Sequence, residues 1–194
     1  YLEETMKFEE EFETVELLVA SNHPTKMVDA FSLSLIKAER QVRKLFTYLV
    51  FQNTNLSSAN VNELRNVLAD FRRVYFEGVV AGINVLSNKT LADLYGEHYE
   101  EDMQRLKTAI SYRNKIFHGQ LTNEKLSSED LGVVIENIKR WCQRLSEVAY
   151  GEYGYCGFGR NSFQKSSLDL SEKISTPINN PDEYHAFITE HMTR

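Results

Sequence analysis

The chain has 194 residues, of which 42% are hydrophobic and 26% are charged. This composition is typical of a soluble globular protein with one sizeable core. No apolar run approaches the roughly 20 residues that a membrane-spanning helix needs, and the acidic start is unlike the basic start of a secretory signal peptide. We therefore expect a cytoplasmic protein that does not enter a membrane. Because the first residue is Tyr1, we also expect that the natural start was removed or belongs to a longer chain.

The formal net charge of −6 is unevenly distributed along the chain. Residues 1–16 hold seven glutamates and one lysine, so 21 acidic and 21 basic residues remain from the totals of 28 and 22. The chain after Glu16 is formally neutral. A local basic surface, and with it a nucleic-acid partner, is therefore compatible with the acidic total.

The residue types that bind metals are few and scattered. Cys142 and Cys156 form neither a CxxC pair nor a zinc-ligand spacing, which favours reduced thiols in a cytosolic setting. His185 and His191 lie six residues apart and would face different sides of a helix. We therefore expect no metal site and no cofactor.

Apolar residues recur at helical intervals through most of the chain, and the alternation typical of strands is missing. The predicted fold class is therefore all-α. The first element is an acidic amphipathic helix over 1–20, in which Phe12 and Val15 belong to an apolar stripe opposite the glutamates. A long helix over about 25–52 follows, and its outer face carries four cations: Lys37, Arg40, Arg43 and Lys44.

A third helix is expected from Asn60, which forms a capping pair with Glu63, to about Leu86. Its apolar stripe has residues three or four apart and includes the following: Val61, Leu64, Leu68, Phe71, Tyr75, Val79 and Ile83. Gly78 and Gly82 lie four apart on this helix. A glycine in a helix interior costs about 1 kcal/mol relative to alanine, so the pair indicates either a close helix approach or two tolerated glycines.

A short element at 90–96 leads into a helix that ends near Gly119, a residue type suited to the position just after a helix C-terminus. A loop then connects to a last core helix, capped by Ser127 or Ser128 and reaching about residue 150. Long helices with short connections indicate a bundle in which neighbours are antiparallel.

Glycine and aromatic residues dominate after this helix, and they show no clear period. We expect an irregular segment lying over the bundle, with a short terminal helix from Pro181 that uses Asn180 as its cap. The predicted organisation has three parts: an acidic helix over 1–20, a bundle of four to five long helices over 25–150, and an irregular extension over 151–194.

The sequence Arg-Asn-Lys-Ile-Phe-His at 113–118 gathers polar groups at a helix end. At 100° per residue, Asn114 and His118 share a face, and Arg113 lies one step round. An imidazole can move a proton near neutral pH, and a guanidinium can hold a phosphate. Together they suit RNA cleavage through its own 2′-hydroxyl, which needs no metal. The same groups can instead complement the helix dipole and satisfy the last carbonyls, and composition alone favours that interpretation.

Residues 113–118 match the R-x4–6-H pattern, in its R-N-x3-H form, of the HEPN superfamily, and the expected helices over about 25–150 resemble its bundle. Many members are metal-independent endoribonucleases of toxin–antitoxin pairs, phage-defence systems and RNA-processing complexes. The resemblance implies that Arg113 stabilises the phosphate in the transition state, that Asn114 orients substrate or the histidine, and that His118 is a general acid or base. It also implies products with a 2′,3′-cyclic phosphate and a 5′-hydroxyl.

One histidine does not suffice for a reaction in which one group removes a proton and another supplies one. The chain contains no second R-x4–6-H pattern. Because HEPN domains usually pair so that both motifs line one cleft, the resemblance implies a homodimer with a composite active site. An antitoxin or other regulatory protein is a further candidate partner. Members paired with a nucleotidyltransferase antitoxin often carry tyrosine two residues after the histidine, where this chain has Gln120.

Residues outside the catalytic trio are candidates for contact with the RNA substrate. Lys115 lies within the motif itself. Arg40, Arg43 and Lys44 could follow an RNA backbone, but a basic helix face is more often only solvated, and Glu39 lies among them. We favour the solvated face for these three residues.

The C-terminal extension adds one more candidate for RNA binding. Arg160 lies between Phe158 and Phe163, a combination that can stack bases. Packing of the extension onto the bundle is the favoured explanation for the two aromatic residues. The acidic first helix is compatible with shielding a basic cleft or with binding a partner, and the sequence does not choose.

Two interpretations other than a nuclease stay open. The first is a catalytically inactive HEPN-like module that binds a partner protein or a nucleotide. The second is a purely structural helical domain of a larger protein. The nuclease interpretation predicts two copies of the motif that face each other across a two-fold interface, in a groove open to a single strand. A motif that points into solvent away from any dimer contact would count against catalysis, whereas a buried His118 bonded to carbonyls of its own helix would favour the capping role.

Overall fold

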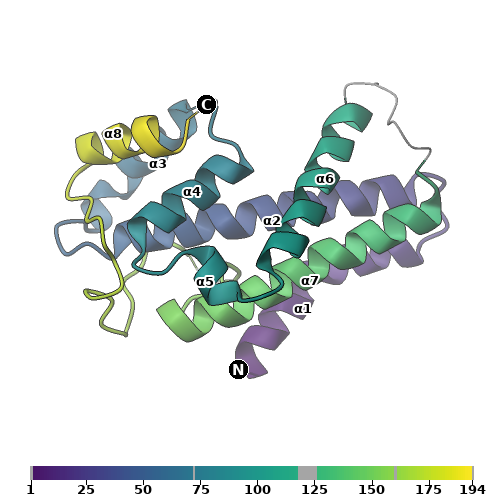
Figure 1. Ribbon diagram of the computed structural model, residues 1–194, viewed down its shortest axis with the longest axis horizontal. Coiled ribbons are helices and arrows are strands. Elements are labelled where there is room, and N and C mark those ends of the chain that lie inside the picture. Colours follow the sequence, from purple (N-terminus) through teal and green to yellow (C-terminus); the bar gives the residue numbers. More distant parts are fainter. Residues whose placement is uncertain (1, 72, 118–125, 160, 194) are drawn as a thin grey trace.

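The computed structural model describes residues 2–71, 73–117, 126–159 and 161–193. In these ranges the chain forms eight α-helices and one 3-10 helix, and no β-strand (Figure 1). The predicted all-α fold class is confirmed. No helix within the same ranges combines the length and the apolar character that crossing a bilayer requires.

Four long helices build the body of the molecule: α1 (Leu2–Ala20), α2 (Lys26–Phe51), α6 (Tyr99–Phe117) and α7 (Ser128–Tyr153). Helix α2 is central, because it packs against α1, α7 and the shorter helix α4 (Phe76–Leu86). Figure 1 shows α6 crossing α2 and α7 steeply, so that its C-terminal part projects from the body. The predicted bounds of α2 hold to within a residue, and Ser127 caps α7 by accepting a 3.1 Å hydrogen bond from the Asp130 N–H.

The predicted long helix over 60–86 is wrong. The chain instead forms η1 (Ser58–Asn60), α3 (Val61–Asp70) and α4 (Phe76–Leu86), and the backbone between α3 and α4 is extended at Phe71. The predicted cap is also wrong, because Asn60 Oδ1 accepts from the Ser57 N–H at 2.9 Å in a capping box of η1.

Tertiary contacts hold the break between α3 and α4 open. The Val74 carbonyl accepts a 2.6 Å hydrogen bond from Arg43, and Val74 forms an isolated β-bridge with Thr193. These contacts occupy backbone groups that a continuous helix would use for its own i to i−4 bonds. Phe71 packs against the core and Val74 is buried within it, so the apolar period continues through the break and conceals it.

The close approach at Gly78 and Gly82 is confirmed, and the neighbour is the end of α8 (Pro181–His191). A Cβ on Gly78 would lie 2.1 Å from the Met192 carbonyl oxygen, and one on Gly82 would lie 2.9 Å from Met192 Sδ. Helix α8 begins as predicted, with Asn180 Oδ1 accepting from the Glu183 N–H at 2.9 Å. The two glycines therefore let the C-terminal helix dock on α4.

The base of α6 is fastened by a buried carboxylate. Asp102 is 6% exposed and accepts hydrogen bonds from the Tyr95 hydroxyl at 2.8 Å, from Arg105 at 3.0 Å and from Arg140 at 3.0 Å. Tyr95 ends the short helix α5 (Leu91–Tyr95), and Arg140 belongs to α7. Burial by itself raises the pKa of Asp102, but these hydrogen bonds outweigh it and lower the pKa. The network ties the first turn of α6 to α5 and α7.

The acidic helix α1 packs onto α2 and α7. Its Glu11 forms ion pairs of 3.3 Å with both Lys37 and Arg40, and its Glu16 pairs with Lys139. Part of its negative charge thus neutralises cations of the adjoining helices. The division of the chain at residues 20 and 150 stays a prediction.

Candidate functional site

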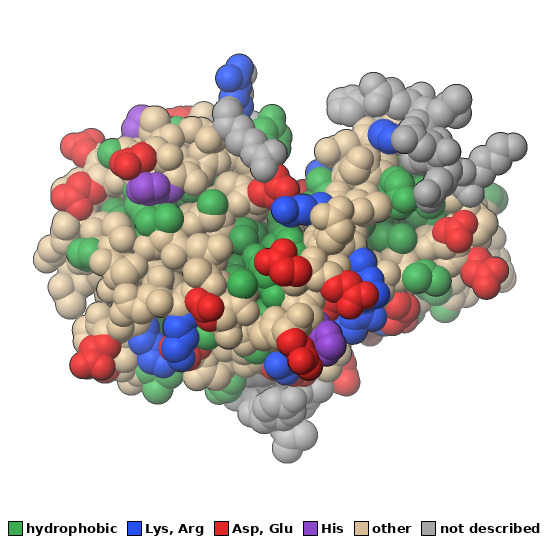
Figure 2. Space-filling view, in the orientation of Figure 1, with side chains coloured by type: hydrophobic (Ala, Val, Ile, Leu, Met, Phe, Trp, Pro, Cys, Tyr) green, Lys and Arg blue, Asp and Glu red, His purple; other side chains and the backbone are tan. Residues whose placement is uncertain are grey.

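A groove of about 550 Å³ lies between the C-terminal half of α6, the middle of α2 and the start of α4. Figure 2 shows it as a hollow beside the projecting part of α6, with hydrophobic side chains inside and charged side chains at its edges. Residues 74–77, which follow the break between α3 and α4, form one wall of the groove, and residues of α6 form another.

The groove brings Arg113 and Asn114 together in one bonded unit. Arg113 donates from Nε and Nη2 to the Asn114 side-chain oxygen at 3.3 and 3.1 Å. Its Nη1 forms a 2.9 Å ion pair with Glu39 of α2. These contacts use three of the five N–H groups of a guanidinium. Since the Asn114 oxygen faces Arg113, the amide nitrogen is the part of that side chain left to donate to another group.

Cations outnumber carboxylates along the lining. Arg43, Lys107, Arg113 and Lys115 line the groove, together with Glu39 and Glu77. Lys107 and Glu77 form a 3.4 Å ion pair. The formal charge of the lining is therefore +2, which favours an anionic ligand.

The rest of the basic face of α2 lies beside the groove. A shallow depression there is lined by Arg40, Lys44 and neighbouring residues, and it shares Glu39 and Arg43 with the groove. Arg40 is paired with Glu11, and Lys44 donates to the Gly159 carbonyl oxygen at 3.5 Å. Burial and the nearby Arg40 lower the pKa of Lys44. These two cations extend the positive surface while also bonding within the protein.

The structure thus places four of the predicted site residues in one groove: Arg43, Arg113, Asn114 and Lys115. Arg40 and Lys44 are adjacent to them. His118 and Arg160 lie outside the described residues, as do Gly119 and Gln120. The assignment of catalytic roles to these residues stays a prediction.

Sequence reasoning missed Tyr75 as a residue of the site. Helical spacing places it in the apolar stripe of a continuous helix, but it is 58% exposed and lies in the groove wall. Tyr75 lies next to the break between α3 and α4, but the apolar period runs through that break, so the sequence pattern gives no sign that the side chain is exposed. The pairing of Glu39 with Arg113 was also not predicted, because these residues are far apart in the chain.

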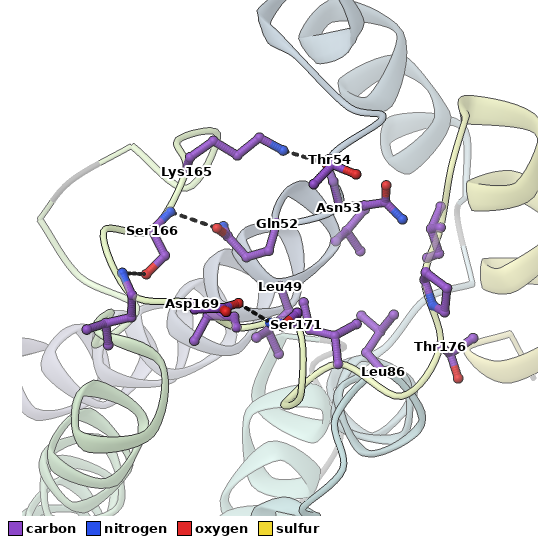
Figure 3. Close-up of a pocket in the computed structure, with 16 residues that line it drawn as sticks. Leu49, Gln52, Asn53, Thr54, Leu86, Lys165, Ser166, Asp169, Ser171 and Thr176 are labelled. Carbon is purple, nitrogen blue, oxygen red and sulfur yellow. Dashed lines mark hydrogen bonds between the residues drawn. The ribbon is translucent and has the colours of Figure 1, made fainter.

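A second cavity, of about 360 Å³, lies between the end of α2 and the C-terminal extension (Figure 3). Several of its polar side chains bond within the protein. Lys165 donates to the carbonyl oxygens of Phe51 and Asn53 at 2.5 Å, and the Gln52 oxygen accepts from the Ser166 N–H at 2.7 Å. These bonds fasten the extension to the last turn of α2, so we assign this cavity a structural role.

Among the described residues, no group of three or more His, Cys, Asp and Glu side chains is arranged to hold a metal ion. Comparison of the chain with protein-family models, with curated proteins and with solved structures found no match. The resemblance to the HEPN superfamily therefore rests on residues 113–118 and on the expected helices, and it stays a prediction.

Proposed function

We propose that this protein is a metal-independent endoribonuclease of the HEPN type and that it acts as a homodimer. The observation that carries the proposal is the bonded pair of Arg113 and Asn114 on the wall of a positively charged groove. Both residues belong to the R-N-x3-H pattern. In the sequence, His118 directly follows Phe117, the last residue of α6.

The proposed reaction uses only groups of the protein and the RNA. A base removes the proton of the ribose 2′-hydroxyl, and the oxygen attacks the adjacent phosphorus. The bond from phosphorus to the 5′-oxygen breaks, and an acid protonates that oxygen. The products are a 2′,3′-cyclic phosphate and a 5′-hydroxyl, so no water and no external nucleophile is consumed.

The groove groups have distinct parts in this reaction. The guanidinium of Arg113 stabilises the negative charge that grows on the phosphate oxygens. The amide nitrogen of Asn114 donates to the substrate or to His118, which is consistent with the oxygen of the same amide being bonded to Arg113. His118 from each subunit supplies the acid and the base in a cleft formed by both copies. We further propose a cytoplasmic toxin or defence effector that an antitoxin or other regulatory protein controls.

The decisive experiment is cleavage of an end-labelled single-stranded RNA in excess EDTA. Wild type should yield cyclic-phosphate ends, and His118→Ala should yield none. His98→Ala is the matched control, because His98 is an exposed histidine directly before the first residue of α6, far along the helix from the motif. Loss of cleavage in both variants, or in neither, would refute the role of His118. Light scattering on the same samples measures whether the active species has twice the mass of the chain.

The second candidate function is a catalytically inactive HEPN-like module that binds a partner protein or a nucleotide. The ion pair between Arg113 and Glu39 favours it, because it gives the arginine a structural partner within the fold. A well-folded, dimeric wild type that binds RNA or nucleotide without cleaving several RNAs in EDTA would support this module over the nuclease.

A further inference from the structure

Tyr75 is an exposed aromatic side chain at the edge of the positively charged groove. It is the residue before α4, with an extended backbone (φ −93°, ψ 173°), and 58% of its surface is accessible. A single exposed aromatic residue is common on protein surfaces and needs no explanation by itself. Here Tyr75 lines the same groove as Arg113 and Asn114. One wall of the groove therefore carries an aromatic ring, and another carries a guanidinium and an amide.

The backbone on both sides of Tyr75 is anchored. Val74 and Phe76 are each 4% exposed and belong to the core. Arg43 binds the Val74 carbonyl, and Val74 is bridged to Thr193. Since its neighbours are fixed, the ring is presented on a rigid platform, and a ligand that stacks on it loses little affinity to ordering of the protein.

The chemistry across the groove suits a nucleotide. An aromatic ring offers a stacking surface for any base. The guanidinium of Arg113 matches a phosphate, and the amide nitrogen of Asn114 can donate to a phosphate oxygen or to a base. The groove volume of about 550 Å³ is in the range of pockets that enclose small molecules.

We propose that Tyr75 stacks a base of single-stranded RNA in this groove, at a nucleotide next to the phosphate that Arg113 binds. This inference rests on the proposed function, because it assigns part of the RNA substrate to the same groove. It restricts the substrate class, since a base can reach the ring only when it is unstacked and unpaired. Duplex RNA is therefore excluded from the site.

Binding of a fluorescein-labelled 2′-O-methyl oligoribonucleotide tests the inference without cleavage, because that strand lacks the attacking hydroxyl. From the usual contribution of base stacking, Tyr75→Ala should weaken binding about tenfold, while Tyr75→Phe should stay within about twofold of wild type. Leu17→Ala, on α1, is the control for loss of an exposed apolar side chain. A 2-aminopurine base in the strand should be quenched by wild type and by Tyr75→Phe, but much less by Tyr75→Ala.

The outcomes separate this inference from the proposed function. If Tyr75→Ala binds the strand as tightly as wild type and cleaves RNA with an unchanged KM, the stacking site is refuted while the nuclease stands. If the strand binds in a Tyr75-dependent way but wild type cleaves no RNA in EDTA, the stacking site is supported and the nuclease is refuted. If wild type binds duplex RNA as tightly as the single strand, or binds neither, the inference is wrong.

Discussion

Replacing Asp102 by asparagine tests how the base of α6 is held. The carboxylate is 6% exposed, and its partners are the Tyr95 hydroxyl and the guanidinium groups of Arg105 and Arg140. The variant keeps the shape of the side chain but removes its charge and one of its two acceptor oxygens. Tyr95 and Arg140 then lose part of the contact that ties α6 to α5 and α7.

The expected cost follows from the exposure of each partner. The side chains of Arg105 and Arg140 are 42% and 51% exposed, so each ion pair contributes only about 0.5–1 kcal/mol after solvent screening. The buried Tyr95 hydroxyl that loses its acceptor adds about 1 kcal/mol. We therefore expect Asp102→Asn to lower the free energy of unfolding by about 2–3 kcal/mol, and Tm by about 5–10 °C for a chain of this size.

The effect should depend on pH. Because the folded-state pKa of Asp102 lies below the unfolded value of about 3.9, its stabilisation is fully present above that value. The stabilisation is lost as pH falls through the lower, folded-state pKa. The difference in Tm between wild type and variant should therefore be largest near pH 7 and should shrink below about pH 4.

Thermal unfolding followed by circular dichroism at 222 nm, from pH 7 down to pH 3, measures this difference. Asp70→Asn is the control, because Asp70 is an exposed carboxylate at the end of α3. A difference at pH 7 no larger than that of the control would refute the structural role assigned to Asp102. A difference that stays constant to pH 3 would show that the charge of the carboxylate is not involved.

Three further predictions follow from other contacts. Gly78→Ala should destabilise the protein by about 2–3 kcal/mol in urea unfolding, because its Cβ would lie 2.1 Å from a backbone oxygen. Gly151→Ala is the control and should not destabilise the protein, because a Cβ at Gly151 would meet no atom within 4 Å. Cys142 and Cys156 are buried, and burial raises the pKa of the Cys142 thiol, so Ellman's reagent at pH 8 should label neither until the protein is unfolded. Glu39→Gln should tighten binding of the 2′-O-methyl strand about fivefold at low salt, because it removes one negative charge beside Arg113; unchanged or weaker binding would contradict a phosphate site there.

Local patterns along the chain predict the elements that depend on few distant contacts. Helices α2 and α7 have long amphipathic stripes, and polar residues mark their starts, so their bounds follow closely from the sequence. The cap at Asn180 follows in the same way, because a capping bond joins residues only three apart. The polar cluster at residues 113–118 was also visible, since a helical repeat places its members on neighbouring faces.

The sequence by itself determined the fold class, the helices α2 and α7, and four residues of the groove: Arg43, Arg113, Asn114 and Lys115. The tertiary structure alone decided the break between α3 and α4, because Arg43 and Thr193 bind the backbone of Val74 from distant parts of the chain. That break exposes Tyr75 and opens the groove. The pairing of Glu39 with Arg113 likewise depends on the tertiary structure, which brings α2 and α6 together. Periodicity indicates which residues of a helix can be buried. The partner of a side chain depends instead on which other helices pack against that helix, and at which residue.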